Sequence, residues 1–139
     1  MRYLLDSCVI SEASRPRPNL NVLSWLDSIA EDDLFVPAIV FGELRKGVER
    51  CRDEAKKVAL TKWLNDCRNF YGGRIVPFDY EAADLWGERV ADLQKRGITP
   101  PVIDSQIAAT ALRHGMTLVT RNVHDMLGFD IKLFNPFDA

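Results

Sequence analysis

Five oxygen-bearing side chains stand where an α/β fold would bring them together. Asp6 follows a short apolar run, Asp104 opens a helical pattern, Asn122 and Asp125 follow a second apolar run, and Glu43 lies inside a helical pattern. In open α/β sheets, groups at the carboxyl ends of strands and the starts of helices meet at one edge, where ligands bind. Carboxylates there suit the hard cations Mg²⁺ and Mn²⁺. The chemistry predicted for such a site is phosphoryl transfer or phosphodiester hydrolysis by an activated water.

Three of these acids also have a purely structural explanation. Asp6 and Asp104 can serve as helix N-caps or as first-turn acids that face the positive end of a helix dipole. Asp125 can cap a short turn in the same way. The residue types alone leave both explanations open.

Glu43 is harder to explain as a surface charge. Ile39, Val40 and Gly47 lie three or four positions away on the same helix face, so the carboxylate would lose hydration unless a cation meets it. Lys46 is the ordinary candidate partner. If Glu43 instead joins other acids, their mutual repulsion implies a bound metal, with one or two ions both possible.

Strand and helix patterns alternate along the chain, which predicts an α/β fold with a parallel sheet covered on both faces. The helix that opens near Asp104 places Ile107, Ala108 and Ala111 on one small apolar face, and Gly115 ends it. Without a repeat or linker, residues 1–139 are expected to form one domain. Strand patterns occupy residues 2–5, 34–36, 74–77, 117–120 and 131–134, and helical patterns occupy 7–12, 20–30, 38–51, 53–70, 81–96 and 101–114.

Composition favours a soluble, cytoplasmic protein. The 139 residues suffice for a sizeable core, no apolar run approaches the roughly 20 residues of a membrane span, and the start reaches an acid too soon for a signal peptide. The three scattered cysteines suggest neither a disulfide framework nor a zinc site. They are expected to be reduced and mostly buried.

Charge is unevenly distributed along the chain. The net charge is −2, but residues 45–74 hold nine Lys/Arg against four Asp/Glu, a balance of +5 that leaves −7 for the remainder. This tract can bind the phosphates of an RNA backbone, or it can be the solvated face of a helix. The basic residues concerned are Arg45, Lys46, Arg50, Arg52, Lys56, Lys57, Lys62 and Arg68.

Taken together, three motifs resemble one family. The opening LLDSCVISE looks like the family's LLDTNVISE, VFGELRKGVE resembles its ELxxG helix, and PVIDSQIAATALRHGMTLVTRNVHDM is similar to its D-x-x-IAATA…G-x-x-LVTRN-x-x-DF region. This is the PIN-domain ribonuclease family, and more narrowly the VapC-type or FitB-type toxins of bacterial toxin–antitoxin pairs. The likeness spans nearly the whole chain, in the family's order and spacing.

The resemblance implies a three-layer α/β/α sandwich with a central, mainly parallel sheet. It also implies an endoribonuclease that depends on Mg²⁺ or Mn²⁺ and acts on RNA, with transfer RNA or initiation-region RNA as the family expectation. The implied partners are a second copy of the chain in a homodimer and a small cognate antitoxin. That antitoxin often binds DNA, so contact with DNA would be indirect, and no membrane is involved.

Carried across by position, Asp6 and Asp104 match the family's metal-binding acids. Glu43 matches its helix carboxylate, which shares in metal binding or water activation. Asn122 falls where many members have a fourth acid, and the TRN-x-x-D variant recurs among toxins. Either Asn122 or Asp125 therefore completes the expected site.

One departure from the family pattern supports a rival hypothesis. Cys8 replaces the usual Asn, which would weaken a hydrogen bond that orients Asp6. With Asn122, it keeps open a catalytically impaired PIN fold that mainly dimerises and holds an antitoxin, although the retained acids favour a nuclease. A phosphatase of the haloacid dehalogenase type would need an acid at position 8, where this chain has a cysteine. A receiver domain would need an acidic pair before the acceptor strand and a lysine near the C-terminus, and the sequence matches that pattern poorly.

Overall fold

The computed structural model describes residues 1–138, and Ala139, the last residue of the expected domain, lies outside the described residues. The strands are β1 (Tyr3–Leu5), β2 (Leu34–Pro37), β3 (Ile75–Val76), β4 (Thr117–Val119) and β5 (Leu133–Phe134). The α-helices are α1 (Ser7–Glu12), α2 (Leu20–Ser28), α3 (Ala38–Glu49), α4 (Glu54–Tyr71), α5 (Tyr80–Lys95) and α6 (Val102–His114). Short 3₁₀ helices are η1 (Glu31–Asp33), η2 (Gly72–Arg74), η3 (Val123–Met126) and η4 (Pro136–Asp138).

The strands form one parallel sheet in the order β3-β2-β1-β4-β5. The central strand β1 pairs Tyr3 with Leu34 of β2 on one side and with Thr117 of β4 on the other. The chain therefore builds outward from β1 to β3, then returns and builds outward again through β4 and β5. Between β1 and β4 this reversal makes a switch point, which is where open α/β sheets commonly bind ligands, at the carboxyl ends of the strands.

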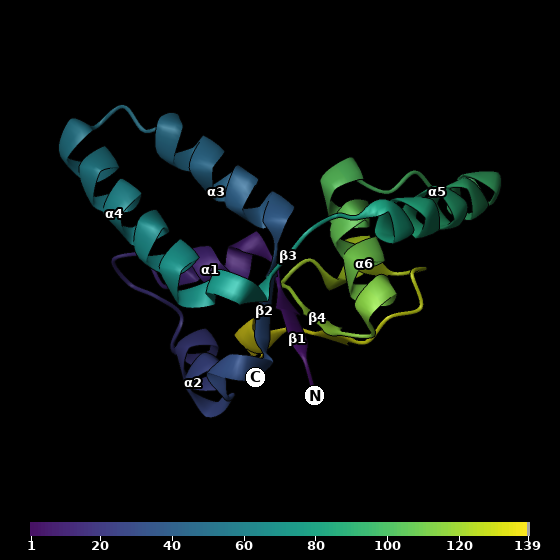
Figure 1. The fold of residues 1–139 in the computed structure, drawn as a ribbon, viewed down its shortest axis with the longest axis horizontal. Helices are drawn as coiled ribbons and strands as arrows, with labels where there is room; N and C mark the ends of the chain where they lie inside the picture. The colour runs from purple at the N-terminus through teal and green to yellow at the C-terminus, as the bar shows by residue number, and fades with distance from the viewer. Residues whose placement is uncertain (139) are drawn as a thin grey trace.

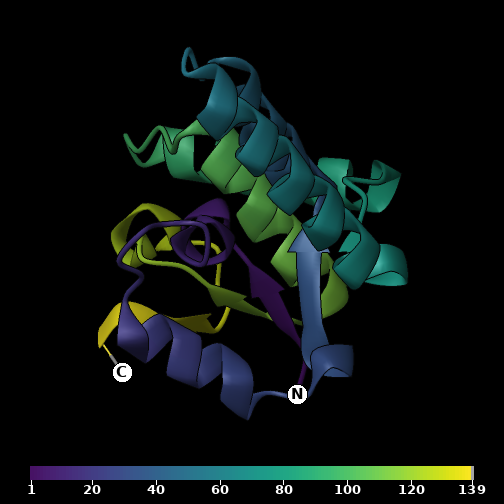
Figure 2. The ribbon, with the colours of Figure 1, turned by 90° about the vertical axis from the view of Figure 1, so that its left-hand side faces the viewer.

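Helices cover both faces of the sheet, which confirms the α/β/α sandwich. Figure 1 shows α1 to α4 on one face and the packed pair α5 and α6 on the other. Figure 2, which faces the first of these layers, shows α2 near the C-terminal end of the chain and away from the hairpin of α3 and α4. In Figure 1, the α3–α4 hairpin and the α5–α6 pair diverge from each other at one end of the sheet.

The predicted helix face of α6 forms part of the core. Ile107, Ala108 and Ala111 are completely buried, as are Leu4 and Leu5 of the central strand. Small side chains on α6 allow the helix to lie close to the sheet. The close packing fixes the start of α6, and with it the first-turn acid, relative to β1.

Local signals place most helix ends as the sequence predicts. Asp53 and Asp79 cap α4 and α5 by accepting hydrogen bonds from backbone N–H groups three residues later. Gly115 ends α6 in the left-handed region at φ 64°. The last strand is shorter than expected, because only Leu133 and Phe134 pair with β4.

The cysteines differ in degree from expectation. All three are free thiols, as predicted, but each is half-buried, whereas the prediction was that they are mostly buried. Within residues 1–138, no helix combines the length and apolar character needed to cross a membrane.

Candidate active site

The carboxylate of Asp6 is buried and held by hydrogen bonds at the end of β1. It is 2 % exposed and caps α1, where the Ser7 N–H donates to Oδ1 at 2.7 Å. The Thr120 hydroxyl donates to Oδ2 at 2.7 Å, and the Asp6 N–H donates to the Val119 carbonyl at 3.0 Å. The capping explanation is therefore correct. It is also compatible with a site, because each carboxylate oxygen has further acceptor capacity.

Thr120 is the site residue that the sequence reasoning missed. It is completely buried at the end of β4, and its hydroxyl both donates to Asp6 and accepts from the Asn122 N–H at 2.9 Å. One hydroxyl thus connects the end of β1 to the turn after β4. The available signal was a threonine inside the LVTRN motif, directly between a buried strand and the turn that carries candidate site residues.

Cys8 makes only weak contacts in this corner. Its Sγ lies 4.0 Å from Asp6 Oδ2 and 3.9 Å from Thr120 Oγ1, and the Arg121 N–H donates to it at 3.5 Å. Burial is the main cause that raises the pKa of the Cys8 thiol, with the nearby Asp6 charge adding to it. A neutral thiol is a poor donor, so the short bond to Asp6 comes from Thr120 instead.

Glu43 and Asp104 are half-buried and lack such strong support. Partial burial is the largest cause that raises the pKa of Glu43, followed by the charges of Asp6 and Asp104; the Ser7 side chain and Lys46 oppose the rise. The pKa of Asp104 is raised by burial first, then by Asp6 and Asp125. These acids therefore lie within electrostatic range of one another. Lys46 has the smallest effect among the causes for Glu43, so it does not fully neutralise this carboxylate.

Helices from the two layers deliver these acids. Glu43 lies in the middle of α3 and Asp104 in the first turn of α6, and Figure 1 shows these helices on opposite sides of the end of the sheet. Both are near Asp6, which follows the central strand. Three elements far apart in the sequence thus carry carboxylates that affect one another electrostatically, and their assignment to one metal site stays a prediction.

Asn122 and Asp125 differ in their relation to this cluster. Both are exposed in the turn after β4, where Asn122 directly precedes η3 and Asp125 lies within it. Asp125 adds negative charge near Asp104 and raises its pKa. Asn122 contributes its backbone N–H to Thr120. The charged group coupled to the candidate site is therefore Asp125.

The donor set fits a hard divalent cation better than a structural zinc ion. Within residues 1–138, no three His, Cys, Asp or Glu side chains are placed so that together they could hold a metal ion. Mg²⁺ is commonly bound by one or two carboxylates and keeps several waters, so it does not need such a group of side chains. Asp6, Glu43 and Asp104 offer oxygen ligands. Burial first and neighbouring negative charge second raise the pKa of Glu43 and of Asp104, and a cation would offset both causes.

Comparison with known proteins agrees with this arrangement. The sequence model of the PIN domain family matches residues 3–124. The chain belongs to the PIN domain family. This match includes Asp6, Glu43, Asp104 and Asn122, and it ends one residue before Asp125.

The PIN domain described here has similar relatives over nearly its full length. It is 37 % identical to Toxin FitB of Neisseria gonorrhoeae over 96 % of this chain and 97 % of that protein. It is 29 % identical to VapC ribonuclease Y4jK of Sinorhizobium fredii, over 97 % of each. The crystal structure of FitAcB from Neisseria gonorrhoeae superposes with a TM-score of 0.94 and 36 % identity, covering 99 % of both chains. The resemblance inferred from the motifs is thus confirmed at the level of family and fold.

Proposed function

We propose that this PIN domain is a metal-dependent endoribonuclease that acts as the toxin of a toxin–antitoxin pair. The observation that carries the proposal is the electrostatic coupling of Asp6 to Glu43 and to Asp104: after burial, the charge of Asp6 is the largest cause that raises the pKa of each of these two acids. The similarity to a protein named as a toxin and to one named as a ribonuclease supports the same function. We also propose that residues 1–139 form a single domain.

The proposed roles follow from the contacts of each side chain. Asp6 and Asp104 would hold Mg²⁺ or Mn²⁺, with Glu43 as a further ligand or as the group that orients the attacking water. A bound divalent ion supplies Lewis acidity, which activates water and neutralises charge developing on the phosphate. Because the pKa of Glu43 is raised, its carboxylate is a better proton acceptor than an exposed glutamate. Asp125 is proposed as the fourth acid, in preference to Asn122.

The reaction expected from the family is hydrolysis of an RNA phosphodiester. Water adds to phosphorus, the bond to the 3′ oxygen breaks, and the products carry a 5′-phosphate and a 3′-hydroxyl. Thr120 takes no direct part: its hydroxyl fixes the Asp6 carboxylate in one orientation. Transfer RNA is one candidate substrate.

The proposed partners extend the resemblance. A small antitoxin would bind and inhibit the toxin, two copies of the toxin would form a homodimer, and DNA would be contacted only through the antitoxin. A cytoplasmic location is expected for a protein that acts on cellular RNA.

Cleavage of total cellular RNA tests the proposal. The purified protein, freed of any bound partner, is incubated with Mg²⁺, with Mn²⁺ or with chelator, beside the Asp104→Asn variant. Discrete cuts that require metal and disappear in the variant are expected. A folded wild-type protein that cuts nothing with either metal would instead support the binding-only alternative, for which the weak 4.0 Å contact between Cys8 and Asp6 is the structural reason.

A further inference from the structure

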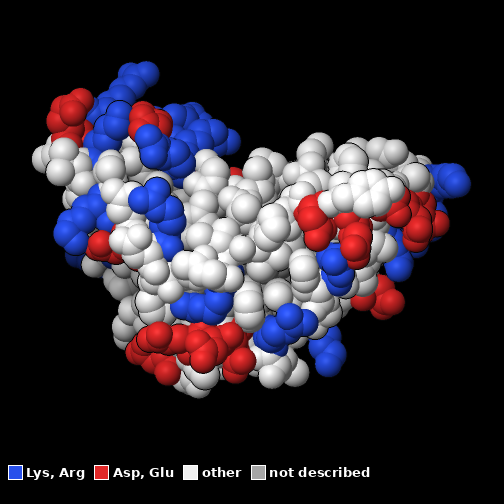
Figure 3. Space-filling model, viewed as in Figure 1, with Lys and Arg blue, Asp and Glu red and all other residues white. Residues whose placement is uncertain are grey.

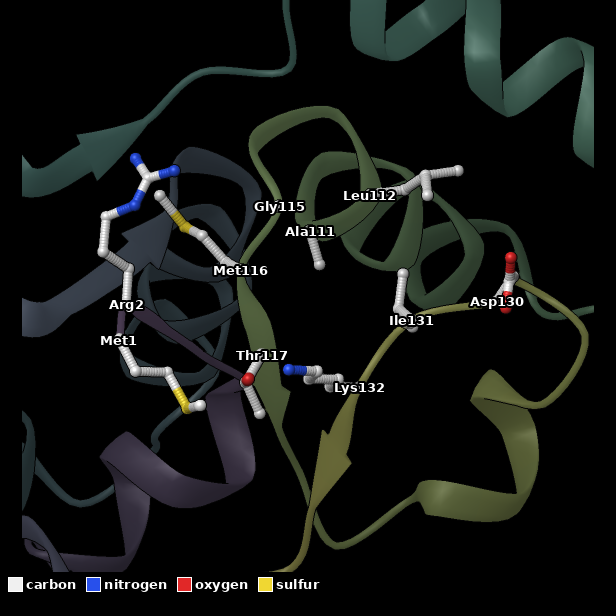
Figure 4. Close-up of a pocket in the computed structure, with 10 residues that line it drawn as sticks. All are labelled: Met1, Arg2, Ala111, Leu112, Gly115, Met116, Thr117, Asp130, Ile131 and Lys132. Carbon is white, nitrogen blue, oxygen red and sulfur yellow. The ribbon is translucent and has the colours of Figure 1, made fainter.

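The basic tract divides into neutralised and free cations on the α3–α4 hairpin, where Lys and Arg gather (Figure 3). Arg45 and Lys57 both pair with Glu49, at 3.1 and 3.6 Å. Lys62 pairs with Asp66 at 2.8 Å. These three cations satisfy nearby carboxylates and lie on the solvated surface, as the alternative reading of the tract predicts.

Three other cations line an open groove of about 470 Å³ between α3 and α4. Lys46 and Arg50 come from the end of α3, and Lys56 comes from the first turn of α4. All three are exposed, and within residues 1–138 none forms an ion pair with a carboxylate. Their charge is available to a ligand.

The groove leads away from the candidate active site. Glu43 lines it together with Gly47 and Arg50, which follow four and seven positions later on the same face of α3. From Glu43 to Arg50 the helix rises about 10 Å. A β-carbon added at Gly47 would meet no other atom within 4 Å, so the space beside this face is open.

The lining favours phosphates over bases. Besides the cations, the groove is lined by Leu60 and Cys51, and no aromatic side chain is present there to stack a base. Lysine and arginine contacts to a nucleic-acid backbone give affinity without reading sequence. An RNA strand whose scissile phosphodiester lies beside the acids extends away from the site in two directions. The positive charge of this groove suits one of these two paths.

We propose that the α3–α4 groove holds the RNA strand on one side of the cut, with Lys46, Arg50 and Lys56 binding successive backbone phosphates. The inference rests on the proposed ribonuclease function and deepens it, because it assigns the path of the substrate. Binding through this path is independent of base identity, so the choice of cut site is made elsewhere in the complex.

Salt-dependent binding tests the assignment directly. Antitoxin-free protein carrying Asp104→Asn, in chelator so that RNA stays intact, is titrated against a fluorescent oligouridylate at several salt concentrations. The groove triple variant has Lys46→Gln, Arg50→Gln and Lys56→Gln. Since single strands release about 0.7 counterions per phosphate contact, losing three contacts should make the log–log salt slope shallower by about 2. Over a fourfold rise in salt, the variant should lose about 20-fold less affinity than its parent.

A matched triple variant controls for net charge. Arg45→Gln, Lys57→Gln and Lys62→Gln remove the same charge from the same hairpin, but at the cations that are already paired. This control should keep a slope close to that of the parent. Equal changes of slope in the two triple variants would overturn the proposal, because they would show a general charge effect.

A steric variant separates the groove from its charge. Gly47→Leu should fill the groove and weaken RNA binding, whereas Gly87→Leu on α5, where an added β-carbon also meets no other atom within 4 Å, should not. Both changes replace a helical glycine with a better helix former, so melting temperatures should not fall. Unchanged RNA affinity in Gly47→Leu would contradict the assigned path.

The outcomes distinguish the proposed RNA path from the proposed ribonuclease function. If wild-type protein cuts RNA and both triple variants bind alike, the path is wrong and the nuclease stands. If the groove variant loses RNA binding but wild-type protein cuts nothing with metal, the proposed function is wrong and the binding path stands. If the groove variant binds RNA normally but loses binding to an oligoglutamate peptide, the groove belongs to an acidic protein segment, and the RNA path is overturned.

Discussion

Two parts of the candidate site hold their carboxylates by different means. We call them the corner, formed by Asp6, Ser7 and Thr120, and the rim, formed by Glu43 and Asp104. Asp6 is buried, yet each of its oxygens accepts a short hydrogen bond, from the Ser7 N–H and the Thr120 hydroxyl. On the rim, Glu43 and Asp104 are half-buried, and burial and neighbouring charges raise their pKa values. Asp6 is the most deeply buried of the three acids, so burial alone would make its carboxylate the most costly to hold. Its hydrogen bonds reverse that order.

The difference shows which acids are complete without a ligand. Hydrogen bonds from the Ser7 N–H and the Thr120 hydroxyl compensate the buried Asp6 carboxylate for lost contact with water. The rim acids receive less of that support, so burial and neighbouring charges make their charged forms less favourable than in water, and a cation would offset that cost. The corner is thus a fixed anchor, and the rim is the part of the proposed site whose energy would change on metal binding.

The largest expected effect comes from removing a rim charge. Asp104→Asn keeps the shape of the side chain but removes its charge, so RNA cleavage should fall on the order of 100-fold or more. Rates are measured on total RNA with Mg²⁺. Asp27→Asn on the exposed surface of α2 is the control and should cleave at the wild-type rate. Undiminished cleavage by Asp104→Asn would show that Asp104 does not belong to the active site.

A smaller loss is expected when the anchor is loosened. Thr120→Val leaves a buried oxygen of Asp6 without its donor, which should lower the free energy of unfolding by about 1–3 kcal/mol. Cleavage should fall by about 10- to 100-fold, as for other residues that orient metal ligands. Thr120→Ser restores the hydroxyl and should recover cleavage more fully than stability, because it still lacks the methyl group. A Val variant with full activity would show that Asp6 needs no such anchor.

The rim should also affect stability when metal is absent. Because the folded-state pKa values of Glu43 and Asp104 are raised, the native state binds more protons than the unfolded state just above the ordinary carboxyl range. The free energy of unfolding therefore falls as pH rises through that window, and the loss is complete above it. At neutral pH in chelator, Asp104→Asn should melt a few degrees above wild type, by roughly 1 kcal/mol or less.

Two conditions should abolish that difference in melting temperature. Below the ordinary carboxyl pKa both forms are neutral, so wild type and Asp104→Asn should melt together. With excess Mg²⁺, wild type should gain stability while the variant gains less. A variant that melts below wild type in chelator at neutral pH would contradict the description of the rim as repulsive.

The smallest effect is expected at Cys8. Its Sγ is already 4.0 Å from Asp6, so Cys8→Asn can add one amide hydrogen bond without removing a strong contact. Cleavage should rise by no more than about tenfold, within the range of effects known for groups that orient metal ligands. Cys8→Ala should differ little from wild type. A large loss in Cys8→Ala would mean that the thiol contributes more to the anchor than its distances indicate.

Much of this arrangement was predictable from the sequence, because the strand and helix patterns and the acids at their ends follow from local periodicity and known caps. The small apolar face at Ile107, Ala108 and Ala111 predicted the close packing of α6. The bond between Thr120 and Asp6 was not predictable, since it joins residues 114 positions apart and depends on the register of β1 against β4. Likewise, only the folded α3–α4 hairpin separates paired from unpaired cations.

The pairing of β1 with β4 also gives the protein an order in time. During synthesis, Asp6 is made 114 residues before its partner Thr120. At translation rates of about 5–20 residues per second, that interval lasts roughly 6–23 s. Until β4 is made, the central strand lacks one neighbour and the Asp6 carboxylate has the Ser7 N–H but not the Thr120 hydroxyl as a donor. Asp6 therefore reaches its native set of hydrogen bonds only late in synthesis.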